Sequence, residues 1–414
     1  MTVTTIESEV RSYSRNWPVV FEQARGSRMT SRDGRVYLDF FAGASALNYG
    51  HNPPVLKRAL IDYLERDGVT HSLDMLTGAK EKFLAEFSAR LLVPRGLEYR
   101  VQFPGPTGTN SVEAALKLAR KVTGRETVVA FTGAFHGMSL GSLAVTGNAA
   151  KRAGAGLPLG HTWRLPYDGF GDGQVSGLKL LDSMVEDSSS GMDLPAAVIV
   201  ETVQGEGGVN PAGHTWLADL AELCRRRGIL LIVDDIQMGC GRTGPFFSFE
   251  AAGITPDIVC LSKSLSGYGL PLALTLFRPE LDVWEPGEHN GTFRGNNPAF
   301  VTATAALREY WSDDLLAKQT EQRGLIVRER LTALARRHPV RVAQVRGRGL
   351  VWGLAFREPE AARRTADAAF ARGLLVETSG SRDEVVKLLP PLTSTDDELA
   401  EGLDLLDEAV AVSG

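Results

Sequence analysis

Short apolar runs alternate with helical patterns through the middle of the chain. Five of these runs are apolar throughout and rich in β-branched residues: TVVAFT (127–132), AAVIVE (196–201), ILLIVDD (229–235), DIVCLSK (257–263) and LALTLF (272–277). Strands that are buried on both faces of a parallel sheet show this pattern, whereas half-exposed strands alternate between apolar and polar residues. Strands separated by helices predict β-α-β units. We therefore expect an α/β fold with a mostly parallel sheet.

The two ends of the chain carry a different pattern. RVYLDFF (35–41) indicates a strand, two amphipathic helical patterns follow within residues 54–92, and a long helical pattern covers 298–337. Three further strand-like segments are GLVWGLAF (349–356), GLLVET (373–378) and EVVKLLP (384–390). Thr395 and Glu398 have the spacing of a capping box and predict a last helix. We expect three parts: an N-terminal segment (1–49) that joins a small α+β domain, a large domain (50–297), and a linking helix with the rest of the small domain (298–414).

Composition excludes several classes of protein. The formal net charge of the 414 residues is −5, which argues against a nucleic-acid partner. The three cysteines are widely spaced and predict neither a disulfide framework nor a zinc site, and the histidines show no metal-ligand spacing, so we expect no metal. No signal peptide and no apolar run long enough to span a bilayer is visible, so we expect a cytoplasmic protein without a membrane partner.

Polar and aromatic groups follow four of the buried runs. TVVAFT leads to Phe135 and His136, AAVIVE ends in Glu201, ILLIVDD reaches Asp234, and DIVCLSK ends in Lys263. Ligands of open α/β sheets bind outside the carboxyl ends of the strands. A single carboxylate or lysine at such a position is often only a cap or a solvated side chain. All four together predict one crevice that holds an aromatic ring, carboxylates and a lysine.

The stretch PGPTGTNSVEAALKLARK (104–121) adds a candidate anion site. A tight turn leads into a strongly helical segment in which Asn110 and Glu113 have capping-box spacing. Turn amides, the hydroxyls of Thr107 and Thr109, and the helix N-terminus together form an anion cradle. The alternative is a helix that is merely well capped.

These groups match the requirements of pyridoxal phosphate. The cofactor needs an anchor for its phosphate, a lysine that forms an imine with its aldehyde, a ring to stack on, and a carboxylate at the pyridine nitrogen. The sequence resembles the class III pyridoxal-phosphate aminotransferases over nearly its whole length, in segments such as FHGMSLGSLAVTG, LIVDDIQMGCGRTG and PDIVCLSKSLSGYGLP. The resemblance implies a fold-type-I transferase, with a seven-stranded, mostly parallel sheet in the large domain and a small α+β domain.

The resemblance also assigns roles to individual residues. It implies that Lys263 is the Schiff-base lysine and that Asp234 pairs with the pyridine nitrogen. The other cofactor contacts that it implies are Thr107, Gly108 and Thr109 at the phosphate, Phe135 and Ile236 on the two ring faces, Gln237 near the ring hydroxyl, and His136 and Glu201 beside the ring. Thr292 would reach the phosphate of a neighbouring subunit, which implies a homodimer.

The substrate contacts are less well defined, because the chain departs from the family pattern twice. The family arginine before PPL is replaced by Lys387, which lacks the bidentate fork of a guanidinium. Arg294 stands where the family usually has glycine. We therefore expect Arg294 rather than Lys387 to hold a glutamate carboxylate, with a structural ion pair as the alternative for Arg294. Glu206 matches a glutamate that neutralises the missing arginine in some members, and Asn48 is a further candidate contact.

Within the family, the segments FFAGASALNYGHN, VQFPGPTGTN and GEHNGTFRGNN are most similar to the branch that serves ectoine biosynthesis. That branch aminates L-aspartate 4-semialdehyde with L-glutamate. The alternatives are a class III relative that acts on ornithine, acetylornithine, lysine or 4-aminobutyrate, a non-catalytic relative, and a nucleotide-binding oxidoreductase. The last lacks support, because the glycines at 267 and 269 have no third glycine at the required spacing.

Overall fold

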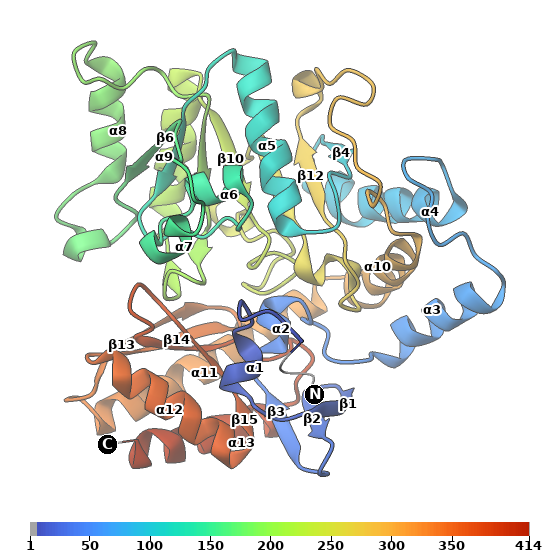
Figure 1. Ribbon diagram of the computed structural model, residues 1–414, viewed down its shortest axis with the longest axis vertical. Coiled ribbons are helices and arrows are strands. Elements are labelled where there is room, and N and C mark those ends of the chain that lie inside the picture. The colour runs from blue at the N-terminus through green and yellow to red at the C-terminus, as the bar shows by residue number, and fades with distance from the viewer. Residues whose placement is uncertain (1–5, 414) are drawn as a thin grey trace.

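A seven-stranded sheet forms the core of the larger of two lobes in the computed structural model, which describes residues 6–413 (Figure 1). Its strand order is β4-β12-β11-β10-β7-β5-β6. The strands are β4 (Arg100–Gln102), β5 (Val128–Phe131), β6 (Thr162–Leu165), β7 (Ala197–Val200), β10 (Leu230–Asp234), β11 (Ile258–Leu261) and β12 (Leu274–Phe277). Only β12 runs antiparallel to its neighbours, β11 and β4. The expected fold is confirmed, and all five apolar runs are strands.

The apolar runs are strands because both faces of this sheet are covered. Along β7, Val198 and Ile199 point to opposite faces and belong to two different buried clusters. Helix α5 (Gly108–Thr123) covers one face, and α9 (His214–Arg227) covers the other. A strand that packs on helices at both faces has no solvent side, which explains why its sequence shows no alternation.

Helix α5 begins one turn earlier than the capping pair chosen from the sequence. Its N-cap is Thr107, and the Asn110 Oδ1 atom accepts a hydrogen bond from the Thr107 backbone N–H (3.2 Å). The expected pairing of Asn110 with Glu113 is therefore wrong by three residues. The Glu113 carboxylate instead accepts a hydrogen bond from the Ser142 backbone N–H (3.0 Å) and ties α5 to α6 (Leu140–Val145).

The smaller lobe contains two four-stranded sheets, β1-β2-β3-β15 and β13-β14-β17-β16. Their strands are β1 (Phe21–Arg25), β2 (Arg28–Ser31), β3 (Val36–Asp39), β13 (Val342–Arg348), β14 (Val351–Phe356), β15 (Leu374–Leu375), β16 (Glu377–Ser379) and β17 (Val385–Leu388). Leu374 pairs with Leu38, so the two ends of the chain share one sheet. Strands β1, β2 and β13 were not predicted from the sequence, because their residues are partly exposed and mixed in polarity.

Helices complete both lobes. They are α1 (Tyr13–Asn16), α2 (Ala42–Ser45), α3 (Pro54–Glu65), α4 (Gly78–Phe87), α7 (Ala149–Ala153), α8 (Gly177–Glu186), α10 (Asn297–Tyr310), α11 (Leu315–Arg337), α12 (Pro359–Arg372) and α13 (Asp396–Val412), with a two-stranded ribbon of β8 (Val203–Gln204) and β9 (Asn210–Pro211). The predicted capping box of α13 is present. The expected single helix over 298–337 is two helices, and α10 packs on α3 and α4 of the large lobe. The domain boundaries at 49/50 and 297/298 stay a prediction. Within residues 6–413, no helix is both long and apolar enough to cross a membrane.

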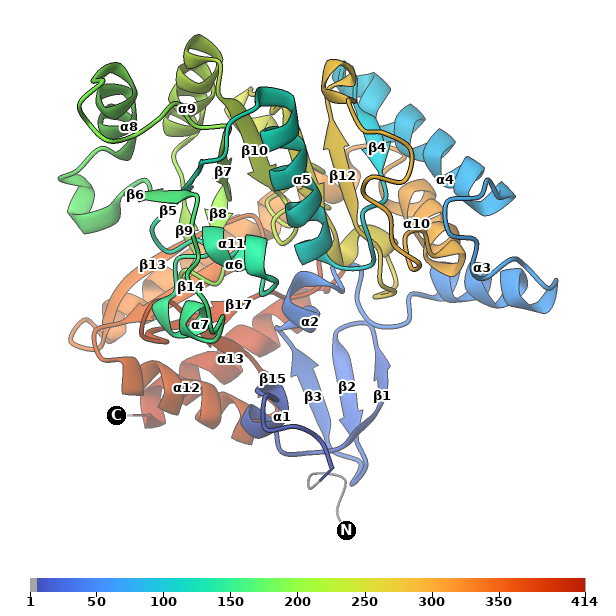
Figure 2. The same ribbon diagram turned by 45° about the horizontal axis from the view of Figure 1, so that its top comes forward.

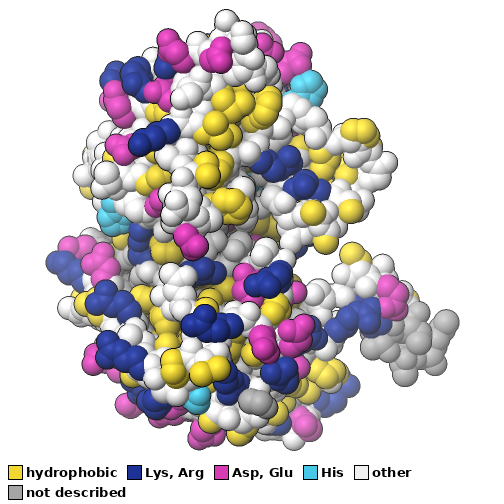
Figure 3. All heavy atoms as spheres, turned by 90° about the vertical axis from the view of Figure 1, so that its left-hand side faces the viewer, with side chains coloured by type: hydrophobic (Ala, Val, Ile, Leu, Met, Phe, Trp, Pro, Cys, Tyr) yellow, Lys and Arg dark blue, Asp and Glu magenta, His cyan; other side chains and the backbone are white. Residues whose placement is uncertain are grey.

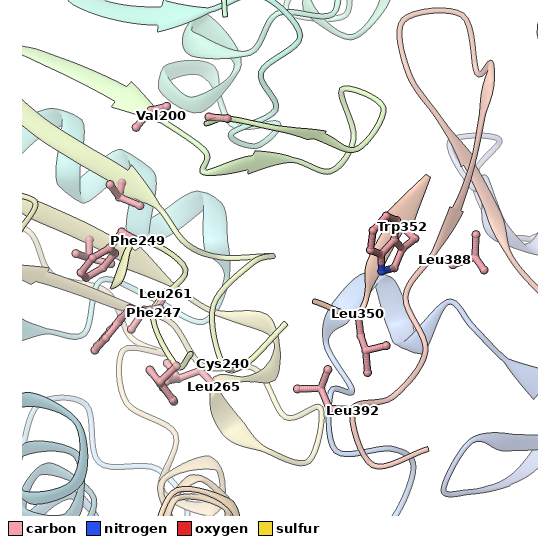
Figure 4. Close-up of a cluster of buried hydrophobic side chains, with 14 of the residues drawn as sticks. Val200, Cys240, Phe247, Phe249, Leu261, Leu265, Leu350, Trp352, Leu388 and Leu392 are labelled. Atoms are coloured by element: carbon pink, nitrogen blue, oxygen red, sulfur yellow. The ribbon is translucent and has the colours of Figure 1, made fainter. Parts of the chain in front are cut away.

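The lobes are joined by apolar packing and by one buried arginine. Leu261 and Leu265 of the large lobe and Leu350 and Leu392 of the small lobe belong to one buried cluster (Figure 4). Arg242 is fully buried and donates hydrogen bonds to Ser45, to Asn48 and to the carbonyls of Leu350 and Pro390. A guanidinium has five donors, which suits a junction where several chain segments end.

Candidate active site

Four neighbouring strands, β11, β10, β7 and β5, deliver their end groups to one edge of the large sheet. Val233 lies opposite Val200, so the residues that follow, Asp234 and Glu201, leave the sheet at the same level. A cavity of about 180 Å³ opens at this edge. It is lined by Gly108, Thr109, Phe135, His136, Gly137, Glu201, Glu206, Asp234, Ile236, Gln237, Met238 and Lys263. The crevice that the strand ends predicted is therefore present.

Lys263 follows β11 directly, and its backbone is strained. Its φ of 50° lies in the left-handed region, which costs a non-glycine residue ~1–3 kcal/mol. The neighbouring hydroxyls hold this turn, because Ser262 donates to the Leu272 carbonyl (2.8 Å) and Ser264 donates to the Ser45 carbonyl (2.8 Å). Burial lowers the pKa of the Lys263 amine, although the Glu206 carboxylate opposes this effect. The turn thus presents an amine to the cavity that loses its proton more readily than a surface lysine.

Asp234 and His136 form a buried pair at the base of the cavity. The His136 Nδ1 atom lies 2.7 Å from Asp234 Oδ2, and both residues are at most 5% exposed. Burial alone would lower the pKa of His136, but the hydrogen bond and the charge of Asp234 raise it. The other carboxylate oxygen, Oδ1, accepts a hydrogen bond from the Ile236 backbone N–H (3.2 Å). The histidine therefore fixes the orientation of the carboxylate.

Glu201 fixes the loop that carries the aromatic ring. Its Oε2 atom accepts a hydrogen bond from the Phe135 backbone N–H (3.0 Å). Burial raises the pKa of Glu201 to about 8, and Asp234 adds to the increase while His136 opposes it. Burial therefore makes Glu201 bind its proton more tightly than a surface glutamate does.

The first turn of α5 forms the side of the cavity that fits a phosphate. A Cβ atom at Gly108 would lie 3.0 Å from the Ile236 side chain, and one at Gly137 would lie 2.5 Å from Thr109 Oγ1. A side chain at either position would crowd this wall of the cavity, so glycine lets the backbone N–H groups of the turn approach a bound anion. Pyridoxal phosphate requires a site for its phosphate, two surfaces for its ring and a carboxylate for its pyridine nitrogen. The N-terminus of α5, the side chains of Phe135 and Ile236, and Asp234 can meet these requirements. The residues present fit this cofactor.

Beyond the cofactor cavity lies a buried ionic cluster of Glu206, Lys387 and Glu377. The Lys387 Nζ atom is 2.6 Å from Glu206 Oε1 and 3.0 Å from Glu377 Oε1, and the Lys387 side chain is fully buried. Burial would raise the pKa of Glu206, but Lys387 lowers it to about 2. Gln237 also donates to Glu206 (3.3 Å) and connects the cluster to the cavity. Because two carboxylates already neutralise Lys387, it does not offer a free charge to a substrate.

The comparisons with known proteins agree with this geometry. The model of the class III aminotransferase family matches residues 10–410. The chain belongs to the class III aminotransferases. A diaminobutyrate–2-oxoglutarate transaminase of Streptomyces coelicolor is 66% identical over 98% of this chain and 96% of its own length, and one of Nocardia farcinica is 64% identical over 98% and 93%.

A solved structure supports the fold and the cofactor of this aminotransferase. The ornithine aminotransferase of Toxoplasma gondii, described with pyridoxal phosphate at partial occupancy in its active site, has a TM-score of 0.84 at 27% identity and covers 98% of this chain and 92% of its own. The chain is a pyridoxal-phosphate-dependent aminotransferase, and the oxidoreductase alternative is set aside.

Five residues predicted for the aminotransferase site do not line its cavity, and one of them, Lys387, lies in the ionic cluster described above. Thr107 is exposed at the N-cap of α5, and Thr292 is exposed on a segment that His71 holds through the Thr292 carbonyl (2.8 Å). Arg294 donates to Asn290 (3.0 Å). Asn48 is fully buried, where it accepts a hydrogen bond from Arg242 (2.6 Å), so this placement gives it a structural role. Thr292 was expected to reach the phosphate of a neighbouring subunit and Arg294 to hold a glutamate carboxylate, and both stay predictions.

Two features of the aminotransferase site were missed in the sequence. Glu377 comes from a segment read only as a strand, and its register opposite Lys387 sets up the buried cluster. The hydrogen bond between His136 and Asp234 was missed as well, since the FHG segment suggested only packing beside the ring. A signal for Glu377 existed, because a carboxylate inside an apolar strand run requires a partner.

Proposed function

We propose that this aminotransferase transfers the amino group of L-glutamate to L-aspartate 4-semialdehyde and forms L-2,4-diaminobutyrate and 2-oxoglutarate. The observation that carries the proposal is the identity of 55–66% to eight diaminobutyrate–2-oxoglutarate transaminases, each over 98% of this chain. The cofactor residues alone would suit any member of the class. The assignment of the substrate is therefore based on the relatives, and the assignment of the chemistry is based on the residues of the site.

Lys263 acts as the proton carrier in this scheme. Its lowered pKa favours the neutral amine, whose Nζ atom removes a proton from the reacting carbon of glutamate. The same amine returns a proton to C4 of the second substrate. Pyridoxal phosphate, when bound, supplies the electron sink that makes the reacting carbon acidic.

Asp234 and His136 supply the electrostatics. The Asp234 carboxylate would stabilise a protonated pyridine nitrogen, while His136 holds the carboxylate in place. Phe135 and Ile236 would restrict the plane of the cofactor ring, and Glu201 and Gln237 would contact its polar groups. The first turn of α5, with Gly108 and Thr109, would hold the phosphate.

We further propose a homodimer in which the segment with Thr292 and Arg294 completes the site of the partner. Both residues lie away from the cavity of their own chain, on a segment in which Phe293 is 67% exposed. An exposed aromatic residue between two polar candidates suits a contact between subunits.

The proposed reaction is tested most easily in reverse. The purified holoenzyme is incubated with 2,4-diaminobutyrate and 2-oxoglutarate, and glutamate is measured. A panel of ornithine, N-acetylornithine, lysine and 4-aminobutyrate serves as the comparison. We expect the highest kcat/KM for diaminobutyrate. Double-reciprocal lines should be parallel, because the first product leaves before the second substrate binds to the other form of the enzyme. A clear preference for another amine would refute the assignment.

A further inference from the structure

A second cavity, of about 310 Å³, shares Phe135 and Glu206 with the cofactor cavity. Four segments line its other sides: residues 133–134, residues 147–151 at the start of α7, Gly207, and residues 378–383 at the end of β16 and in the turn after it. Helix α7 lies where the large lobe meets the small lobe (Figure 2). The surface is visibly hollowed where the two lobes meet, with Lys and Arg side chains beside the hollow (Figure 3). The second cavity is thus a direct neighbour of the cofactor cavity that contains Lys263.

Lys151 is the cation of this cavity. Its Nζ atom lies 4.5 Å from the centre of the Phe135 ring, and within residues 6–413 that atom has no hydrogen bond or ion pair. Three other cations nearby are occupied. Lys387 is held by two carboxylates, and the neighbouring Arg152 and Arg164 donate to backbone carbonyls.

Ser379 adds a buried donor without a partner. The residue is 3% exposed and lines the cavity, and its Oγ atom has no hydrogen-bond partner among the described residues. A buried hydroxyl without a partner costs ~1–3 kcal/mol. A ligand that accepts a hydrogen bond from Ser379 removes this cost when it binds.

The cavity also carries two carboxylates, that of Asp383 and that of Glu206, which already pairs with Lys387. One ammonium group and one unpaired hydroxyl can bind the carboxylate of a zwitterionic amino-acid head group, and the carboxylates suit the ammonium on the same carbon. They suit a phosphate poorly, since a carboxylate in the site would repel it.

We propose that this cavity receives the α-amino-acid end of the four-carbon amine, with Lys151 and Ser379 binding its carboxylate. The inference rests on the proposed function and names the residues that distinguish an ω-amino acid from a simple amine. The distal carboxylate of 2,4-diaminobutyrate then lies against Lys151 while its C4 amino group reaches Lys263. Lys151 is a specificity-determining residue: it binds the carboxylate of the substrate and takes no part in the proton transfer at Lys263.

The test compares two amines that differ by this carboxylate alone, 2,4-diaminobutyrate and 1,3-diaminopropane. Each amine donates its amino group to the cofactor of the holoenzyme in a single half-reaction. This half-reaction is measured by the change in cofactor absorbance. Lys151→Ala should lower kcat/KM for diaminobutyrate roughly 10- to 100-fold, as expected for loss of a charged hydrogen bond, and leave 1,3-diaminopropane unchanged. Lys151→Arg should restore part of the loss, and Ser379→Ala should give a smaller one. Lys179→Ala, at an exposed lysine of α8, is the matched control.

A second readout is independent of turnover. L-Homoserine, which carries a hydroxyl in place of the reacting amine, should raise the melting temperature of the wild-type holoenzyme but not that of Lys151→Ala. The inference is overturned if Lys151→Ala keeps the wild-type ratio of the two amines, or loses both equally. If the wild type itself does not react with diaminobutyrate, the proposed function is refuted. That result concerns the wild-type enzyme, whereas refutation of the inference comes from the comparison of the wild type with Lys151→Ala.

Discussion

Replacement of Lys387 by methionine should reveal how strongly the buried cluster contributes to stability. The substitution keeps most of the side-chain volume but removes the only cation within 3.0 Å of both Glu206 and Glu377 among the described residues. In the wild type the pKa of Glu206 is about 2 against an ordinary value of 4.5. A tenfold change in proton affinity is worth ~1.4 kcal/mol, so this difference corresponds to about 3 kcal/mol. Removal of one partner of a buried pair costs ~3–5 kcal/mol, in agreement.

The loss should depend on pH. In the wild type, Glu206 has a lowered pKa, so its contribution is complete above about pH 4.5 and is lost only as the pH falls towards 2. Burial already raises the pKa of Glu377 in the wild type, and without Lys387 the pKa values of Glu377 and Glu206 both rise further. The folded variant then binds a proton that the unfolded chain releases, and its stability falls as the pH rises. The difference between the two proteins should therefore grow from pH 5.5 to pH 8.

The measurement is guanidinium unfolding of the holoenzyme at pH 5.5 and pH 8, at fixed protein and cofactor concentrations, because cofactor binding also stabilises the folded state. Lys318→Met is the control, since Lys318 is 65% exposed and its pair with Asp314 should contribute under ~1 kcal/mol. A loss below about 1 kcal/mol at pH 8, or an equal loss at both pH values, would show that the cluster is not a buried ionic unit.

Four further outcomes follow from the site and its surroundings. Lys263→Ala should abolish transamination, and borohydride reduction of the wild type should leave the pyridoxyl group on the Lys263 peptide; a label on another lysine would contradict the assignment. Asp234→Ala should keep the far-ultraviolet circular dichroism spectrum and lose at least ~10²-fold in kcat, whereas retention of the rate would exclude its electrostatic role. Arg294→Ala should raise the KM for glutamate roughly 10-fold, and an unchanged KM would leave Arg294 a structural residue. Gly267→Ala should lower the unfolding free energy by ~1–3 kcal/mol, because its new Cβ would lie 2.5 Å from Ala306; a neutral effect would show that α10 can move.

The sequence by itself determined five of the seven strands of the large sheet and the end groups of four of them, but not the short strands β4 and β6. An apolar run such as ILLIVDD is a local property, and the residue after its last apolar position lies at the carboxyl edge of the sheet wherever the strand is placed. For this reason the strand pattern alone predicts that Lys263, Asp234, Glu201 and Phe135 share one crevice. The strands β1, β2 and β13 could not be found, because their partly exposed residues have no such periodicity.

Only the tertiary structure decided which groups meet across long distances in the chain. Glu377 and Lys387 become partners through the antiparallel register of β16 and β17, and Glu206 reaches them from the large lobe. Lys151 lies over the Phe135 ring because α7 folds back beneath it. Burial changes the chemistry of each of these side chains, since a charge without water needs a partner. That partner is set by packing and by strand order, which no local pattern in the sequence specifies.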